Sequence, residues 1–302
     1  MPHSQRPALS GLLLAAVGAI AFSGKAIIVK LSYVYGVDAV TVIMYRMLFA
    51  LPFFIAMGLW AERQAIARAN PLTRRDVLSI AGLGFVGYYL SSYLDFLGLQ
   101  YITASLERLI LYLNPTLVVL LGWVLYKKPV QPIRMVAMGV SYSGVLLVFA
   151  HELTLSGADV ALGSGLIFAS AITYAVYLIF SGQMVNRIGA LRLVGWATSV
   201  ACVCCILQFV LLRPISAAQV PVAVLGLALL NALACTVAPV LMVMMAIERI
   251  GAALTAQTGM IGPMATIALG VWVLNEPLNI WIGAGTLLVL SGVFIVSKYG
   301  TR

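Results

Sequence analysis

The chain has 302 residues, a net charge of +9 at pH 7, and 63% hydrophobic against only 9% charged residues. A water-soluble domain carries about 25% charged residues, so this composition excludes a soluble globular protein and predicts a chain that faces lipid. The positive charge does not indicate a nucleic-acid partner, because the basic residues lie in short loops and form no basic face with interleaved aromatic side chains. Orientation in a membrane explains it better.

Apolar segments long enough to span a bilayer recur along the whole chain. A spanning helix needs about 20 mostly apolar residues, and only helices satisfy their own backbone hydrogen bonds in hydrocarbon. The first segment continues past Lys25 for a full span, so we expect a helix there rather than a cleaved signal peptide. We therefore predict an all-α membrane protein of ten transmembrane helices. Their ranges are 9–32, 39–60, 77–98, 101–125, 133–149, 160–183, 191–212, 221–247, 251–274 and 280–297.

Two parts of the chain repeat each other. Residues 101–148 overlay residues 249–296 without a gap, at a spacing of 148 residues. A proline inside an apolar run, a turn that contains proline and a final Ser-Gly-Val recur in step. This predicts two five-helix repeats, residues 1–152 and 153–302. Because each repeat has an odd number of spans, the second enters the membrane inverted, as in carriers that work by alternating access.

Lysine and arginine are unevenly divided between the two sides of the predicted bundle. The side with both termini and the loops after the even-numbered spans carries thirteen of them, whereas the other side has only Arg213 clearly in a loop. Positive loops face the cytoplasm, so we predict a multi-pass protein of the bacterial inner (plasma) membrane with both termini cytoplasmic. The thirteen are Arg6, Arg63, Arg68, Arg74, Arg75, Lys127, Lys128, Arg134, Arg187, Arg192, Arg249, Lys298 and Arg302.

The repeat resembles that of a known family. Pro115 or Pro263 in an apolar run, a turn that ends in Pro129 or Pro277, and a glycine near the end of the next span are similar to the EamA family of the drug/metabolite transporter superfamily. The resemblance implies a carrier of amino acids, other small metabolites, sugars or lipid-linked sugars. Aromatic amino-acid exporters of that superfamily are the nearest functional comparison. The family often has glutamate in the turn, and Glu276 matches it.

The first repeat departs from that pattern, because Lys127 and Lys128 occupy the corresponding turn. We carry no family role onto it.

Five charged residues lie inside the predicted spans, all in the first repeat: Lys25, Arg46, Asp95, Glu107 and Arg108. A charge at the bilayer centre costs about 2.5–3.5 kcal/mol on insertion scales, so each needs a partner or a function. At about 1.5 Å per residue, four of them fall in one layer, roughly 10 Å from the outer end of the bundle, and Asp95 lies slightly nearer that end. Three cations and two carboxylates leave one positive charge, which a substrate carboxylate can neutralise.

Two other interpretations of this layer stay open. In the first, Glu107 or Asp95 is protonated in one state and couples transport to protons. In the second, the layer is an internal salt-bridge network that holds spans one to four together.

Polar side chains follow one face of several spans. The third span has Tyr88, Ser91, Ser92 and Asp95 at helical spacing, and the sixth has a stripe that includes Tyr174 and Tyr177. Such stripes turn toward protein or a water-filled cavity; interhelical hydrogen bonding is the alternative. We predict a substrate-binding cavity formed by Lys25, Arg46, Tyr88, Ser92, Asp95, Glu107, Arg108, Tyr174, Tyr177 and Thr258.

Prolines inside spans four and nine predict bending elements. Each removes a backbone donor and frees the carbonyl four residues earlier. Pro115, Gly259 and Pro263 are the predicted gating residues, with the Gly259 carbonyl a possible ligand.

Small residues four apart predict close-packing seams on spans one and six, which begin at Gly11 and Gly165.

The function predicted from the sequence is secondary active export of a small organic metabolite, an amino acid or similar zwitterion, by alternating access. No nucleotide, metal or other cofactor motif is present, since the four cysteines lie in apolar spans without histidine. A proton or substrate gradient would drive transport, and the oligomeric state is left open. The alternatives are a carrier of sugars, nucleotide-sugars or lipid-linked substrates, a passive channel, or an embedded enzyme using Glu107 or Asp95. We expect no enzyme, because the chain offers no nucleophile pair.

Overall fold

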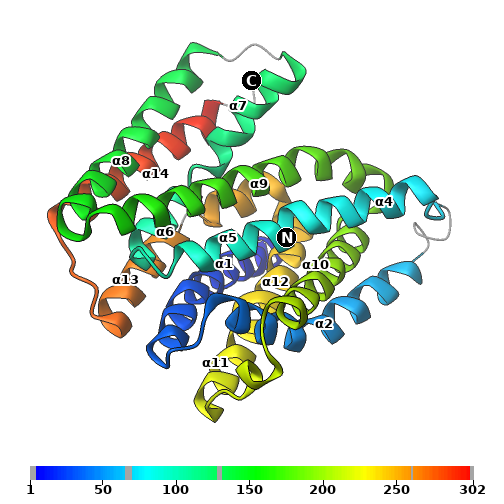
Figure 1. Ribbon diagram of the computed structural model, residues 1–302. Coiled ribbons are helices and arrows are strands. Elements are labelled where there is room, and N and C mark those ends of the chain that lie inside the picture. Colours follow the sequence, from blue (N-terminus) through cyan, green and yellow to red (C-terminus); the bar gives the residue numbers. More distant parts are fainter. Residues whose placement is uncertain (1–4, 65–69, 128–130, 260, 300–302) are drawn as a thin grey trace.

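A computed structural model describes residues 5–64, 70–127, 131–259 and 261–299, and within them every regular element is a helix. Eight helical runs there are long and apolar enough to cross a membrane, and two shorter apolar helices follow. The predicted all-α membrane fold is therefore confirmed (Figure 1).

The helices of the first half are α1 (Gln5–Val34), α2 (Ala39–Glu62), α4 (Arg74–Leu83), the π-helix η1 (Gly84–Leu90), α5 (Ser91–Gly98), α6 (Ala104–Leu111), α7 (Asn114–Tyr126) and α8 (Pro132–Ser156). Those of the second half are α9 (Ala158–Ile188), α10 (Ala190–Leu212), the 3-10 helix η2 (Ile215–Ala218), α11 (Val222–Ala232), the π-helix η3 (Leu233–Val237), α12 (Ala238–Gly259), α13 (Gly262–Leu274) and α14 (Ile280–Tyr299). The proposed boundary between residues 152 and 153 falls in the last turns of α8.

The backbone repeats at the spacing seen in the sequence. The bounds of α13 are those of α7 shifted by 148 residues, and α14 begins 148 residues after α8. Lys127 and Asn275, which follow α7 and α13, both have left-handed backbone, with φ of 51° and 53°. Each repeat also places a π-helix, η1 or η3, within its third span. Equivalent sequence thus gives equivalent backbone, down to single residues.

Spans four and nine are interrupted next to the two prolines at which the sequence predicts bends. The fourth breaks between α6 and α7, just before Pro115, and the ninth breaks between α12 and α13, just before Pro263. Proline has no N–H and its ring clashes with the carbonyl four residues earlier, so each proline starts a new helix instead of bending one. Gly251, with φ of 80°, marks the turn between spans eight and nine inside α12.

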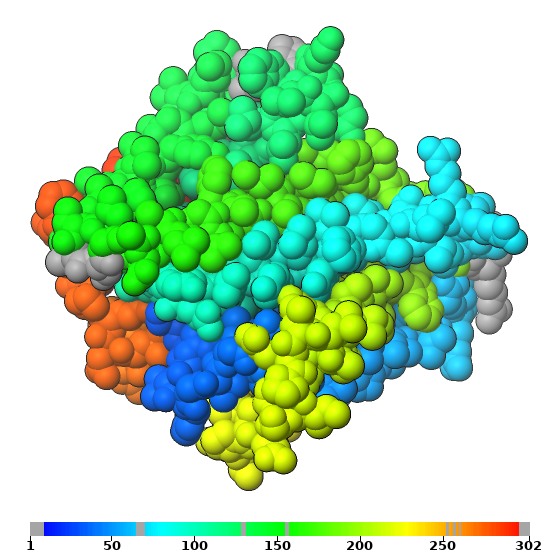
Figure 2. Space-filling model, in the orientation of Figure 1, coloured from blue at the N-terminus to red at the C-terminus, as the bar shows by residue number. Residues whose placement is uncertain are grey.

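Contacts between helices of opposite repeats hold the two repeats together. The most extensive contacts join α8 with α14, α1 with α12, and α2 with α10. α9 runs along α5 and η1, as α1 runs along α12 (Figure 1). Figure 2 shows the face on which α4 and α5 lie between α9 and the segment of α10 and α11. Side chains pack closely across this face.

Glycines decide where two helices touch. A Cβ on Gly195 would lie 2.7 Å from the backbone nitrogen of Gly58, so α2 and α10 cross in backbone contact. The predicted seam on span one is present at Gly11, where a Cβ would collide with Ile250. The seam predicted at Gly165 is wrong, because that residue is exposed with open space around it. Gly163 makes the contact instead, two residues and more than half a helical turn away.

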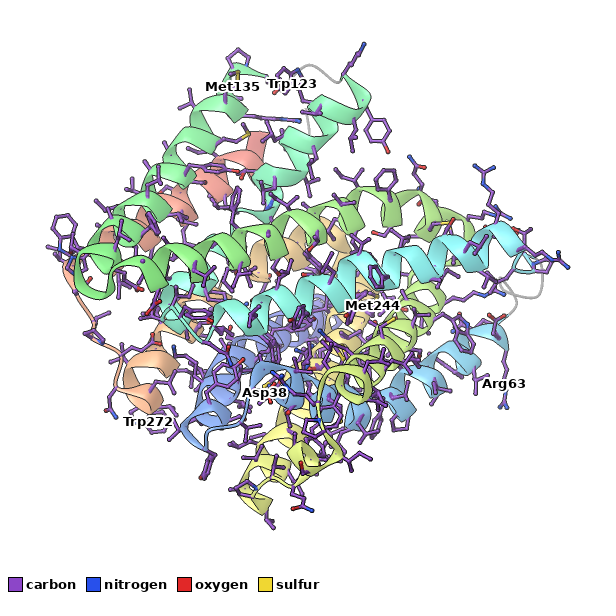
Figure 3. All side chains as sticks on the ribbon, viewed as in Figure 1. Asp38, Arg63, Trp123, Met135, Met244 and Trp272 are labelled. Carbon is purple, nitrogen blue, oxygen red and sulfur yellow. The ribbon has the colours of Figure 1, made fainter. Side chains whose placement is uncertain are left out.

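The outer surface matches a bilayer. Large apolar side chains point away from the bundle, among them Trp123, Met135 and Trp272 (Figure 3). Asp38 and Arg63 flank α2 and lie at opposite ends of the bundle (Figure 3). We therefore call these ends the Asp38 end and the Arg63 end.

Candidate substrate-binding cavity

A cavity of about 350 Å³ lies between helices of both repeats. Met244, one of its wall residues, lies well inside the bundle in Figure 3. Its polar wall residues come from α1, α2, η1, α5, α6, α7, α9, α10 and η3. They are Lys25, Arg46, Tyr88, Ser91, Ser92, Asp95, Arg108, Tyr112, Asn114, Ser170, Tyr174, Thr198 and Thr236.

A second cavity of about 390 Å³ continues from the first. The two share Phe22, Arg108, Tyr112 and Tyr174 among their walls. The second extends along α1 to Ala15, and therefore toward the Arg63 end, because α1 runs toward Asp38. A continuous space thus leads from mid-bundle toward that end.

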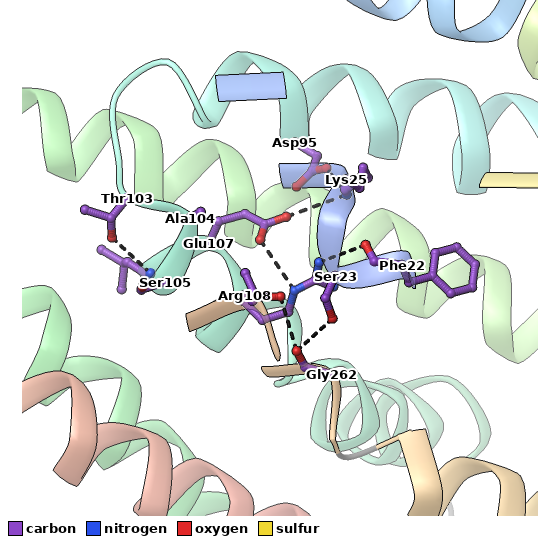
Figure 4. Close-up of polar contacts among 12 residues, drawn as sticks. Phe22, Ser23, Lys25, Asp95, Thr103, Ala104, Ser105, Glu107, Arg108 and Gly262 are labelled. Carbon is purple, nitrogen blue, oxygen red and sulfur yellow. Dashed lines mark hydrogen bonds and ion pairs between the residues drawn. The ribbon is translucent and has the colours of Figure 1, made fainter. Parts of the chain in front are cut away.

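Four of the five intramembrane charges form one network (Figure 4). Lys25 Nζ donates to Asp95 Oδ2 and lies 3.6 Å from Glu107 Oε1. The other oxygen of Glu107 lies 3.8 Å from Arg108 Nε, and Arg108 donates to the Phe22 carbonyl at 3.3 Å. Glu107 is fully buried. These contacts link α1, α5 and α6, which agrees with the predicted layer.

Arg46 lies outside this network. Its side chain is buried, with the guanidinium carbon 5.0 Å from the centre of the Phe96 ring. Among the described residues it makes no ion pair, and its Nε and one Nη have no hydrogen-bond partner. A buried charge of this kind is costly unless it is paired. The surplus positive charge therefore lies on Arg46, in the wall of the cavity.

Unpaired acceptors line the same cavity. Lys25 binds Asp95 Oδ2, whereas Asp95 Oδ1 and Asn114 Oδ1 have no hydrogen-bond partner among the residues that the structure describes. The cavity thus offers both free donors, on Arg46, and free acceptors. Groups of opposite polarity in one space suit a ligand that carries both a positive and a negative charge.

Three tyrosines make up one side of the site. The rings of Tyr174 and Tyr177 stack with centres 5.7 Å apart, and Tyr88 meets Tyr177 edge-on at 4.9 Å. The hydroxyls of Tyr88 and Tyr177 lie 3.3 Å apart. Tyr88 and Tyr174 face the cavity, while Tyr177 supports both from behind.

The structure brings seven of the ten predicted cavity residues to the wall, and places Glu107, Tyr177 and Thr258 elsewhere. Glu107 lies behind Lys25 and Arg108, because its carboxylate neutralises them. Thr258 donates its hydroxyl to the Leu254 carbonyl on its own helix. Helical spacing alone could not separate a wall residue from one directly behind it.

Tyr112 joins the two proline breaks, and the sequence analysis missed it. Its hydroxyl donates to the Gly259 carbonyl at 2.7 Å, the group that Pro263 leaves without a backbone donor. Ser23 donates to the nearby Gly262 carbonyl, also at 2.7 Å. Gly259 borders the second cavity, whereas Pro115 and Pro263 line neither. The signal that could have found Tyr112 was the freed carbonyl, which needed a donor.

Comparison with known proteins identifies the family. The profile of the EamA-like transporter family matches residues 9–150 and again residues 161–298. The chain belongs to this family. It is 29% identical to the uncharacterized transporter YcbK of Bacillus subtilis over 305 residues, which covers 96% of this chain and 92% of YcbK. An uncharacterized transporter of Archaeoglobus fulgidus is 21% identical, covering 94% of this chain and 96% of that protein.

A solved crystal structure shares the fold. It superposes with a TM-score of 0.65 over 97% of each chain, at 16% identity. At that identity the likeness concerns the fold alone. The family and the names of the relatives indicate a membrane transporter of a small molecule rather than an enzyme.

Proposed function

We propose that this EamA family member is a secondary active transporter that exports an amino acid or a similar zwitterion by alternating access. The observation that carries the proposal is the unpaired guanidinium of Arg46 in the cavity wall. A substrate carboxylate would supply the missing partner. Arginine suits this role, because its planar donors match the two oxygens of a carboxylate.

The remaining groups of the cavity would bind the rest of the substrate. An ammonium group would be bound by Asp95 Oδ1 and Asn114 Oδ1, two acceptors of the cavity wall that lack partners among the described residues. The apolar walls, which include Met47, Phe54 and Tyr174, suit a side chain of moderate size. A site built to pair both charges of a zwitterion would reject ligands that lack one of them, because its own polar groups would remain unpaired.

Glu107 is the proposed site of proton coupling. It is fully buried and lies 3.6–3.8 Å from Lys25 and Arg108, beyond hydrogen-bond length. A carboxylate held this loosely in a desolvated position can exchange between charged and neutral forms as its two neighbours move. Substrate at Arg46 would shift the balance of the whole network by adding one negative charge.

The proposed cycle uses the proline breaks as hinges. The second cavity leads toward the Arg63 end, and the Tyr112–Gly259 hydrogen bond lies where the two cavities meet. Movement of α12 against α6 at this point would open or close the passage. Positive-inside counting places the Arg63 end in the cytoplasm, so the described state would accept substrate for export.

Counterflow in proteoliposomes tests the proposal. Labelled amino acids are screened with unlabelled substrate inside, with and without a pH gradient, for the native protein and for Arg46→Gln. We expect saturable counterflow that Arg46→Gln weakens by about tenfold or more in apparent affinity, the effect of losing a charge-assisted bidentate contact. Arg213→Gln, at an exposed arginine outside the cavity, is the matched control.

Each other outcome has a distinct meaning. Native affinity in Arg46→Gln would exclude the carboxylate contact, and counterflow of sugars alone would favour the sugar carrier. Flux that never saturates would indicate a channel. Proton-driven flux at the native rate in Glu107→Gln would remove the coupling assignment.

A further inference from the structure

A carboxylate of one repeat is bound to the start of a helix in the other repeat. Glu276, in the loop between α13 and α14, accepts a hydrogen bond from the Ala104 backbone nitrogen at 2.7 Å. Its second oxygen accepts from the Ser105 hydroxyl at 2.8 Å and from the Ser105 backbone nitrogen at 3.3 Å. These donors belong to the first turn of α6. The side chain is buried, and the helix dipole favours its negative charge.

The local backbone aims this carboxylate. Asn275, just before it, has left-handed φ of 53°, and the Glu276 nitrogen donates to the Gly270 carbonyl at 3.1 Å. A Cβ on Gly270 would lie 2.9 Å from the Glu276 carboxylate, so glycine leaves room for it. The turn is therefore shaped for the contact.

Further contacts surround the junction. Lys30 Nζ donates to the Ile102 carbonyl at 2.6 Å, and the Thr103 hydroxyl donates to Glu152. Thus α1, the start of α6, the end of α8 and the loop after α13 all meet here. Lys30 is five residues beyond Lys25 on α1, about 7.5 Å further toward the Asp38 end. The junction consequently lies between the charged wall of the cavity and that end of the bundle.

The opposite end cannot form the same capping contact, although other ion pairs join the repeats there: Arg192 with Glu62, and Arg187 with Asp76. At the spacing of 148 residues, Gly251 corresponds to Thr103, and Lys128 corresponds to Glu276. Thr103 caps α6 by accepting from the Leu106 nitrogen at 3.1 Å, whereas glycine has no side chain to cap with. A lysine ammonium cannot accept a hydrogen bond from a backbone N–H. The capping contact can therefore form at one end only.

We propose that Glu276 is a latch that holds the cavity closed at the Asp38 end, and that it must leave the start of α6 when that end opens. Because this capping contact can form at one end only, it biases the transporter toward the state that is closed at the Asp38 end and accessible from the Arg63 end. The inference rests on the proposed alternating access but not on the identity of the substrate.

Thiol labelling of the cavity tests the latch. Val240→Cys, in the cavity wall, is placed in a background whose four native cysteines are replaced by alanine, and a membrane-impermeant maleimide is added from each side in turn. In a separate variant, Ser216→Cys in the exposed helix η2 identifies which side is the Asp38 end. Without substrate, we expect slow labelling of Val240→Cys from that side and faster labelling from the other.

Glu276→Ala should raise the labelling rate from the Asp38 side by about tenfold and lower it from the Arg63 side, since a charge-assisted contact is lost. Ser105→Ala, which removes one of the three hydrogen bonds, should change both rates in the same directions by less. Glu248→Ala, at an exposed glutamate near the Arg63 end, is the control and should change neither.

Unchanged rates in Glu276→Ala, or an equal rise from both sides, would overturn the latch. If Glu276→Ala does not fold, as judged by its gel-filtration profile, the Ser105→Ala rates decide in the same way. Because no substrate is added, failure of amino-acid transport would leave this result standing. Conversely, labelling rates that contradict the latch would not affect the counterflow test of Arg46.

Discussion

At the residue scale, two buried cations of the cavity should respond oppositely to removal. Arg46 makes no ion pair within the part of the chain that the structure describes, so Arg46→Met should leave the unfolding temperature unchanged or raise it, because an unpaired buried charge is removed. Lys25 is paired with Asp95, so Lys25→Met should destabilise by about 3–5 kcal/mol, because it leaves that carboxylate unpaired. Thermal unfolding of the detergent-solubilised variants, followed by tryptophan fluorescence, measures both. Equal destabilisation would mean that Arg46 is a structural residue and not a free ligand site.

The loop residue Asp38 should make stability depend on pH. Burial raises the pKa of Asp38, but hydrogen bonds from Thr41 and Arg213 and the charge of Arg213 outweigh it, so the pKa lies below its usual value of about 4. A carboxyl whose folded pKa is depressed adds stability above its unfolded pKa, and loses it as pH falls through the folded pKa. Asp38→Asn should therefore lower the unfolding temperature at pH 7, and the difference from native should shrink as the pH falls through the depressed folded pKa of Asp38. A constant difference across that range would show that shape, not charge, matters at this position.

Single residues also show what the sequence could and could not predict about the site. The surplus positive charge followed from counting, since charges in lipid are few. That it lies on Arg46 did not follow, because Lys25 and Asp95 are 70 residues apart and only the folded chain shows that they pair. The contacts of Glu276 could not be predicted either, because the backbone groups that it binds are 171 and 172 residues away in the sequence. The local sequence pattern predicts whether a side chain is buried or exposed, whereas the group that it binds depends on the tertiary structure.

At the scale of elements, the crossing of α2 and α10 depends on glycine. Gly195→Ala would place a methyl group 2.7 Å from the Gly58 backbone nitrogen, which neither helix can relieve without moving apart. We expect a loss of about 1–3 kcal/mol in the free energy of unfolding. Gly226→Ala in α11, where nothing lies within 4 Å, is the matched control and should cost nothing. A tolerated Gly195→Ala would indicate that the two helices are free to separate.

The proline breaks should govern rate more than affinity. Tyr112→Phe keeps the ring but removes the donor to the Gly259 carbonyl, while Pro263→Ala returns a backbone donor to that carbonyl. A hydrogen bond between membrane helices averages about 0.6 kcal/mol, so stability should change little. We expect each variant to alter the maximal transport rate by severalfold with the apparent affinity within about twofold. If the double variant Pro115→Ala, Pro263→Ala transports at the native rate, the proline breaks are not hinges.

The elements themselves were largely predictable. Ten apolar stretches and the matched prolines specify ten spans, because hydrocarbon permits little besides helix. The prolines correctly located the interruptions of spans four and nine. The seam predicted at Gly165 failed, because a shift of two residues turns a helix face from protein to lipid. Periodicity therefore locates a span more reliably than it locates which side of the span is buried.

At the scale of the whole molecule, orientation is the property on which export depends. The state described has its second cavity toward the Arg63 end and its Glu276 junction toward the Asp38 end. If the Arg63 end is cytoplasmic, this arrangement exposes the cavity to the cell interior, as an exporter needs for loading. If it faces outward, the same geometry would suit uptake. The direction of transport therefore depends on two properties together: which end of the bundle is cytoplasmic, and which end Glu276 holds closed.

Labelling in intact cells decides between the two directions. In the background without native cysteines, Ser216→Cys marks the Asp38 end and Gln64→Cys, an exposed position next to Arg63, marks the other end. The thirteen basic residues on the Arg63 side predict that an impermeant maleimide labels Ser216→Cys in intact cells, and Gln64→Cys only after the membrane is permeabilised. Labelling of Gln64→Cys alone in intact cells would reverse the topology, and the described state would then load substrate from outside. Labelling of both would mean that the chain inserts in two orientations, in which case Glu276 would bias each population toward the opposite side.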